Sequence, residues 1–135
     1  MKRLRFDMMT VFQKVYDWLS GVKPLPVDEK IEFKVMLGSL VIGTLRADKG
    51  QWVFAYSDEF RKQKDIKPIV DFPATDREYR DRTLWPFFAL RIPSPKQPEV
   101  REFIERLPED KVDQSILLKE FGTRSIANPF RLVPV

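Results

Sequence analysis

Side chains that could carry out acid–base or metal chemistry are sparse in this sequence. The 135 residues include neither cysteine nor histidine. This excludes a thiol nucleophile, a Cys/His zinc site and the side chain that titrates nearest neutral pH. The carboxylate pairs Asp28–Glu29 and Glu109–Asp110 lie in charged, turn-like stretches, where solvated surface is the simpler interpretation. No spacing of acidic residues resembles a calcium-binding loop, so we expect neither a metal site nor catalytic residues.

The sequence offers no recognisable nucleotide-binding loop. Its five glycines are scattered, so neither the G-x-G-x-x-G pattern nor the G-x-x-x-x-G-K-[S/T] loop can form. We therefore expect that the protein is not an enzyme and that it needs no cofactor.

The segment most suggestive of binding is 84–90, Leu-Trp-Pro-Phe-Phe-Ala-Leu, because its large side chains cannot all face one way. We expect Phe87 and Phe88 to enter the core. Trp85 precedes a proline, and an aromatic ring on a stiff turn loses little entropy when it binds. Tryptophan is also enriched at the energetic centres of protein interfaces, so we predict that Trp85 contacts a partner.

From the charge pattern and the hydropathy we expect a cytoplasmic protein that does not bind nucleic acid or membrane. The chain has 24 basic and 20 acidic side chains, but their signs are interleaved, as in residues 76–82. A nucleic-acid-binding protein usually gathers its positive charge into one patch, so a mixed, solvated surface is the simpler interpretation. The N-terminus lacks the apolar stretch of a signal peptide, and no apolar run is long enough to span a membrane.

Residues 4–20 are predicted to form an amphipathic helix that ends near Gly21. Apolar residues recur in it at three- and four-residue spacing. Two interpretations stay open: a helix that packs on the core, and a helix that binds a partner, including a second copy of the chain in a homodimer. Two prolines within 22–29 predict a linker. We therefore expect an N-terminal helix and linker over 1–30 and a folded domain over 31–135.

The folded domain is predicted to begin with a three-stranded antiparallel meander. Alternating or β-branched apolar residues predict strands over 31–37, 40–45 and 52–56. Gly38-Ser39 and Asp48-Lys49-Gly50 supply the two turns.

The second half must be built from short pieces, because nine of the eleven prolines lie from Pro68 onward. The expected pieces are a short helix capped by Ser57, an extended stretch over 67–73, one helical turn opening near Thr83, a rigid loop over 92–95, a helix from Pro98, a helix from Asp113 to Gly122, and a strand over 130–133. We expect an α+β fold: a small, bent antiparallel sheet or partly open β-barrel with two or three packed helices.

The helices predicted within 98–121 allow a second function, because two helices with a short connector resemble a helix-turn-helix. Their connector is acidic, and the second helix offers only Gln114, Ser115 and Lys119 to base edges. A DNA-binding regulator is therefore the first alternative, and a generic protein-interaction module is the second.

Several short motifs together resemble the N-terminal subdomain of HipA-type serine/threonine kinase toxins. The resemblance runs from residue 33 to residue 134 and rests on the order of five segments. These are Val41-Ile42-Gly43-Thr44-Leu45, Trp52-Val53-Phe54-Ala55-Tyr56, Lys67-Pro68-Ile69 through Phe72-Pro73, Leu84-Trp85-Pro86-Phe87-Phe88, and Leu117-Leu118-Lys119-Glu120-Phe121-Gly122. The chain departs from the family at Arg91-Ile92-Pro93-Ser94-Pro95, where the family has a Leu-Leu-Pro-Glu/Asp-Gly-like stretch.

The resemblance implies a binding role. In HipA-type kinases this subdomain precedes a kinase core, and the sequence to Val135 carries none, so we expect a free-standing HipS-like antitoxin. Such a protein would bind and inhibit a HipT/HipA-like kinase, with a HipB-like DNA-binding protein as a further partner and no direct contact with nucleic acid or membrane. The predicted partner-binding residues are Trp85, Arg91, Pro93, Ser94 and Pro95.

Overall fold

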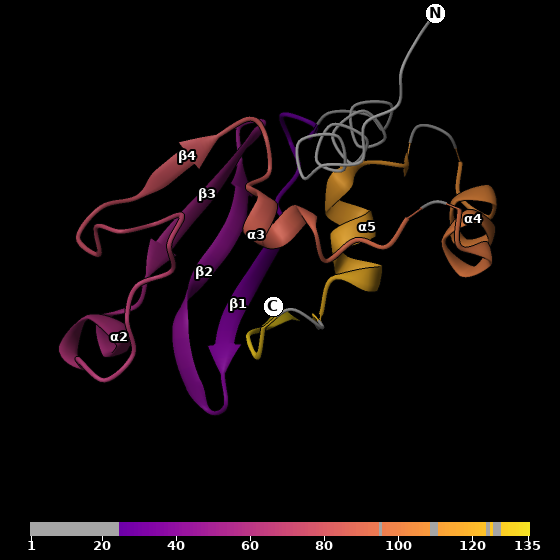
Figure 1. The fold of residues 1–135 in the computed structure, drawn as a ribbon. Coiled ribbons are helices and arrows are strands. Elements are labelled where there is room, and N and C mark those ends of the chain that lie inside the picture. Colours follow the sequence, from indigo (N-terminus) through magenta and orange to yellow (C-terminus); the bar gives the residue numbers. More distant parts are fainter. Residues whose placement is uncertain (1–24, 95, 109–110, 124, 126–127) are drawn as a thin grey trace, which may run out of the picture.

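The computed structural model describes residues 25–94, 96–108, 111–123, 125 and 128–135 (Figure 1). The strands are β1 (Glu32–Leu37), β2 (Leu40–Asp48), β3 (Gln51–Tyr56), β4 (Tyr79–Asp81) and β5 (Arg131–Pro134). The helices are α2 (Asp58–Lys62), α3 (Pro86–Ala89), α4 (Pro98–Glu105) and α5 (Gln114–Phe121). The helix predicted over 4–20, and with it the predicted homodimer contact, lies outside the described residues.

The strands form one antiparallel sheet in the order β4-β3-β2-β1-β5. The sheet is open, so the predicted α+β fold is confirmed in its open-sheet form, and the described residues include four short helices. The β2–β3 hairpin turns at Lys49 and Gly50, which have φ values of 53° and 80°. Two successive positive φ angles match the right-handed twist of the flanking strands, which explains the Asp-Lys-Gly sequence there.

The backbones of β2 and β3 approach each other closely at Gly43. This glycine on β2 lies opposite Tyr56 on β3, beside the irregular register at Val35 and Met36. A Cβ atom on Gly43 would lie 2.3 Å from the carbonyl oxygen of Ala55, so only glycine fits there without a shift of the backbone.

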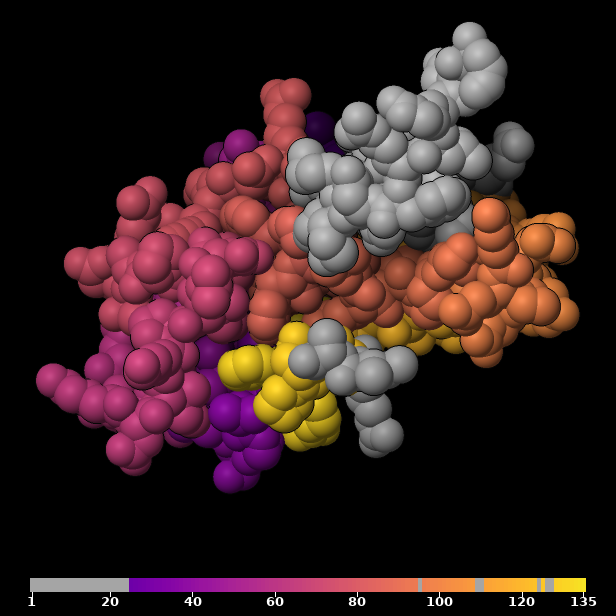
Figure 2. Space-filling view, viewed as in Figure 1, coloured from indigo at the N-terminus to yellow at the C-terminus, as the bar shows by residue number. Residues whose placement is uncertain are grey.

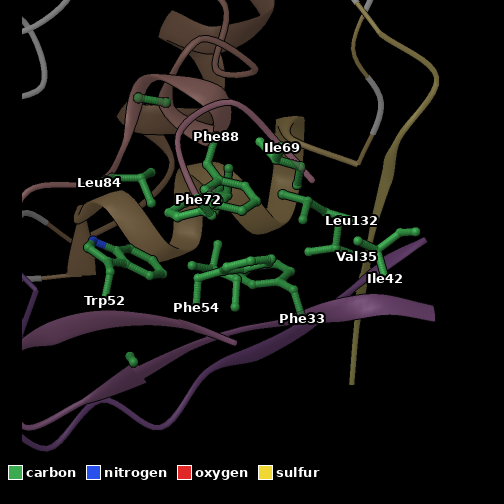
Figure 3. Close-up of a cluster of buried hydrophobic side chains, with 14 of the residues drawn as sticks. Phe33, Val35, Ile42, Trp52, Phe54, Ile69, Phe72, Leu84, Phe88 and Leu132 are labelled. Carbon is green, nitrogen blue, oxygen red and sulfur yellow. The ribbon is translucent and has the colours of Figure 1, made fainter. Parts of the chain in front are cut away.

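One face of the sheet carries the hydrophobic core. Alternate residues of the strands, among them Phe33, Val35, Trp52 and Phe54, are at most 1% exposed (Figure 3). Alternation places every second side chain on the same face, and in Figure 3 these side chains point toward a layer formed by the later segments. That layer consists of α3, α5 and the connection between α2 and β4.

The opposite face of the sheet carries charge. Arg46 on β2 and Arg80 on β4 flank Val53 in the strand register. Both arginines pair with Asp48 and Glu78 at nitrogen–oxygen distances of 3.1–3.6 Å. Val53 is only 1% exposed, as expected where the aliphatic stems of long charged side chains cover an apolar neighbour.

Two tyrosines fix the connection that crosses the core between α2 and β4. The Tyr56 hydroxyl donates to the Phe72 carbonyl at 2.6 Å and accepts from the Ile69 amide at 2.9 Å. The Tyr79 hydroxyl bonds both backbone groups of Ala74. Residues 67–73, predicted as extended, contain a turn in which the Phe72 amide donates to the Ile69 carbonyl.

The outer edge of β5 is closed to strand addition. The Leu132 amide, which points away from β1, donates to the Thr123 carbonyl at 2.9 Å. The next outward position is Pro134, which has no amide hydrogen. A partner therefore gains little by pairing its backbone with this edge.

Replacing Tyr56 with Phe tests how firmly the connection is held. The substitution leaves the Phe72 carbonyl and the Ile69 amide unpaired in a buried site, so we expect a loss of about 1–3 kcal/mol in the free energy of unfolding, measured by urea titration. An unchanged unfolding midpoint would contradict this account of the connection.

Tyr56 should also make the free energy of unfolding sensitive to alkaline pH. Burial raises the pKa of Tyr56 to about 12, whereas an unfolded tyrosine has a value near 10. The contribution of the neutral hydroxyl is fully present below pH 10 and is lost as the pH rises toward 12, because ionisation then favours the unfolded chain. The free energy of unfolding of the wild type should therefore fall more steeply than that of Tyr56→Phe over this range.

Candidate docking surface

The backbone of the Trp85–Leu90 segment is rigidly held. Trp85 is the N-cap residue of α3, with φ −63° and ψ 147°, and Pro86 occupies the first helical position. The Trp85 carbonyl accepts from the amides of Phe88 and Ala89, both at 2.9 Å. Proline at this position costs no hydrogen bond and presets the helical φ angle, which explains why the helix begins at Pro86 and not near Thr83.

The Trp85 side chain lies partly on the core and partly in solvent. Its ring meets the Phe72 ring edge-on, with centroids 5.0 Å apart and an interplanar angle of 84°. It also approaches Phe88 at 6.5 Å, and the residue as a whole is half-buried. The indole is thus fixed by the core on one side and available on the other, as the predicted contact role requires.

Of the two phenylalanines of α3, Phe88 enters the core as predicted, whereas Phe87 packs against the edge of the core. Phe88 is fully buried, and its ring contacts Phe54 and Phe72. Phe87 is half-buried and packs on Phe130, at 5.6 Å between ring centroids. Leu90, at the C-terminal end of α3, is 52% exposed and adds an apolar side chain to the surface beside the helix.

Arg91 is buried. The residue is 5% exposed, and its guanidinium carbon lies 5.4 Å from the centroid of the Phe87 ring. Nη2 donates to Oδ1 of Asn128 at 3.0 Å, and the same oxygen accepts from the Phe130 amide. Nε and Nη1 are buried without a hydrogen-bond partner. Burial lowers the pKa of Arg91 to about 10, so the side chain is still charged at neutral pH.

The loop after Arg91 supplies the remaining predicted contact residues. Pro93 is half-buried and Ser94 is exposed. The Ser94 hydroxyl and carbonyl accept from the amides of Lys96 and Gln97, which form a local turn. Pro95 lies outside the described residues. No ring contact or hydrogen bond joins Trp85 to Pro93 or Ser94 within the described part of the chain.

Two residues with notable positions, Val70 and Asn128, were not predicted from the sequence. Val70, 90% exposed, occupies the turn whose ends are held by Tyr56. Asn128 bridges Arg91 and the start of β5. The dipeptide Asn128–Pro129 is a turn signal that could have indicated this role, whereas nothing local marks Val70 as exposed.

The surface of the segment around α3 forms the middle of one face of the molecule. In Figure 2 it lies between the magenta surface of the connection after α2 and the yellow surface of the C-terminal residues. We call Trp85, Leu90, Pro93 and Ser94 the docking surface.

The predicted helix pair is explained by packing. Gln114 Oε1 accepts from the Trp52 indole at 3.3 Å, and Ser115 is 2% exposed, with its hydroxyl donating to Asp113. Two of the three side chains expected to face bases are therefore occupied within the domain. Leu117 and Leu118 are fully buried, so α5 serves as a covering helix of the sheet.

The described residues carry neither a metal-binding cluster nor a membrane-spanning helix. No group of three or more acidic side chains is placed to hold a metal ion in this part of the chain. Within the same ranges, no helix has the length and apolar character needed to cross a membrane.

These features define a class: a small α+β domain whose open antiparallel sheet is covered on one face by short helices and proline-rich loops. A family model described as the HipA N-terminal domain matches residues 33–128, and the chain belongs to this family. A solved structure described as the N-terminal domain of HipA toxin is 21% identical, with a TM-score of 0.52 over 78% of this chain and 92% of that one. At that identity the likeness concerns the fold. The comparison with curated proteins gave no match.

The position of Trp85 predicts a modest role in stability. Replacement with Ala removes ring contacts on one side only, so we expect a loss of about 1–3 kcal/mol in the free energy of unfolding, against roughly 3–5 kcal/mol for Phe72→Ala in the core. Urea unfolding of both variants measures the difference. Equal losses would mean that Trp85 is a core residue and not a surface contact.

Proposed function

We propose that this chain is a HipS-like antitoxin: a non-catalytic subunit that binds a HipT/HipA-like serine/threonine kinase and holds it inactive in the cytoplasm. The observation that carries the proposal is a half-exposed tryptophan on a rigid turn in a member of the HipA N-terminal domain family. The absence of nucleotide-binding patterns from the sequence supports a binding role over catalysis.

The docking surface suits tight protein binding because its geometry is fixed in advance. The Trp85 indole rests against Phe72, and the backbone around it is hydrogen-bonded through α3. Binding therefore costs little side-chain or backbone entropy, which leaves more of the contact energy as affinity. In this proposal the segment 84–95 presses against the kinase near its nucleotide or substrate cleft.

Side-chain contacts, and not strand addition, would carry the interaction. One sheet edge is blocked by Thr123 and Pro134, and the other is the three-residue strand β4, which carries charged side chains. In the proposed complex DNA contact belongs to a separate HipB-like protein, which agrees with the engagement of Gln114 and Ser115 inside the domain.

The proposal is tested by co-purifying the chain with a HipT/HipA-like kinase and measuring the affinity of variants by calorimetry. Trp85→Ala should weaken binding by about 2 kcal/mol or more, because hot-spot tryptophans lose at least this much on truncation. Phe103→Ala is a matched control, since Phe103 is half-buried with one ring contact but lies on α4, away from α3 (Figure 1).

Two outcomes would count against the proposal in different ways. A wild-type chain that forms no complex would refute the kinase-binding function. A complex that Trp85→Ala weakens by less than about 0.5 kcal/mol would refute the docking surface and leave the kinase partner standing.

A further inference from the structure

Arg91 is a buried charge without a counter-ion among the described residues. Within the described ranges its guanidinium makes one hydrogen bond, to the neutral amide oxygen of Asn128, and Nε and Nη1 have no partner. The ion pairs of the described residues join other side chains on the sheet and on α2. Buried polar groups are nearly always paired, so this arginine calls for an explanation beyond stability.

The groups around Arg91 do not compensate for the desolvation of its charge. Among the described residues, the Phe87 ring offers a cation–π contact at 5.4 Å and Asn128 accepts a hydrogen bond. A buried cation is stabilised chiefly by a carboxylate with which its planar donors can form two parallel hydrogen bonds. Burial also lowers the pKa of Arg91 to about 10, because the charged form is less well solvated there than in water.

The local charge favours an acidic partner. Residues 84–98 include two basic side chains, Arg91 and Lys96, and no acidic one. Arg91 lies between exposed Leu90 and the loop that carries Ser94, both part of the docking surface. Nε and Nη1 have no hydrogen bond to lose, so an acidic partner would compete only with the Asn128 hydrogen bond and the Phe87 ring contact for this side chain.

We propose that Arg91 is the anion-binding residue of the docking surface and pairs with a carboxylate on the bound kinase. The inference rests on the proposed function and adds the chemistry of the partner: an acidic side chain facing the C-terminal end of α3. The pair would form through donors that include Nε and Nη1, so the complex would satisfy the groups that the free chain leaves unpaired.

The test compares Arg91→Met with Arg101→Met, a control on the exposed face of α4. In the isolated chain, Arg91→Met should unfold at a temperature no lower than the wild type, because an apolar side chain of similar length replaces an unpaired charge. In the complex it should weaken kinase binding about 30-fold or more, the range seen when a buried interfacial charge pair loses a partner. Arg101→Met should change neither quantity.

The salt dependence separates an ion pair from a structural role. Wild-type affinity should fall more steeply than that of Arg91→Met as sodium chloride rises, because screening weakens the charge pair. Equal slopes would overturn the carboxylate assignment, as would an Arg91→Met chain that is less stable than the wild type yet binds the kinase normally. If Trp85→Ala abolishes binding and Arg91→Met does not, the proposed function survives and this inference fails.

A measurement on the isolated chain tests the same inference without the kinase. Sodium acetate should raise the unfolding temperature of the wild type above its value in sodium chloride of equal ionic strength, by at least about 2 °C more than it does for Arg91→Met. Equal shifts in the two proteins would contradict carboxylate binding at Arg91.

Discussion

The stacking of Phe72 on Phe54 is the contact on which the covering layer depends. The two rings lie 4.3 Å apart, nearly parallel, and join the centre of the sheet to the connection that crosses it. The Phe72 ring also meets Tyr79, Trp85 and Phe88. An open sheet with one apolar face must be covered, and here a single aromatic side chain links the sheet, the connection and α3. Each element that contacts Phe72 is thereby fixed relative to the others.

This arrangement explains how a chain with many prolines presents a rigid surface. Prolines prevent long helices and inner strands in the second half, so the layer is built from short segments. Short segments are weakly stable alone, and they are held here by ring contacts and by hydroxyls such as that of Tyr56. Trp85 lies at the outer side of this cluster, where the core fixes one side of the ring and solvent reaches the other. The position of the proposed docking surface is thus a consequence of how the sheet is covered.

Local patterns in the sequence predicted much of the fold. Alternation gave the three strands of the meander, and Asp113 caps α5 by accepting from the amides of Ser115 and Ile116, as its position indicated. The strand β4 was missed, because three charged or polar residues carry no periodic signal and pair only where β3 offers an edge. The predicted extended stretch 67–73 proved to contain a turn, which long-range bonds from Tyr56 hold in place.

The candidate site was predictable only in part. Trp85 was predicted as a contact residue because Pro86 stiffens the backbone beside it, and this effect can be read from the two adjacent residues. The burial of Arg91 depends on Phe87, Asn128 and the course of the chain into β5, and none of these is a local property. Its five hydrogen-bond donors favour the surface, so sequence reasoning placed it there. The sequence likewise left open whether the sheet closes into a barrel. The strand order decides this, because β4 and β5 are edge strands that do not pair with each other.

The central claim is that this chain binds a kinase through the surface around Trp85 and holds it inactive. The most direct measurement is autophosphorylation of a HipT/HipA-like kinase, titrated with the purified chain. The account predicts that phosphate incorporation falls to the background level near one equivalent of the wild-type chain. Autophosphorylation that is unchanged at saturating, demonstrably bound chain would contradict the inhibitory role and leave only a structural subunit.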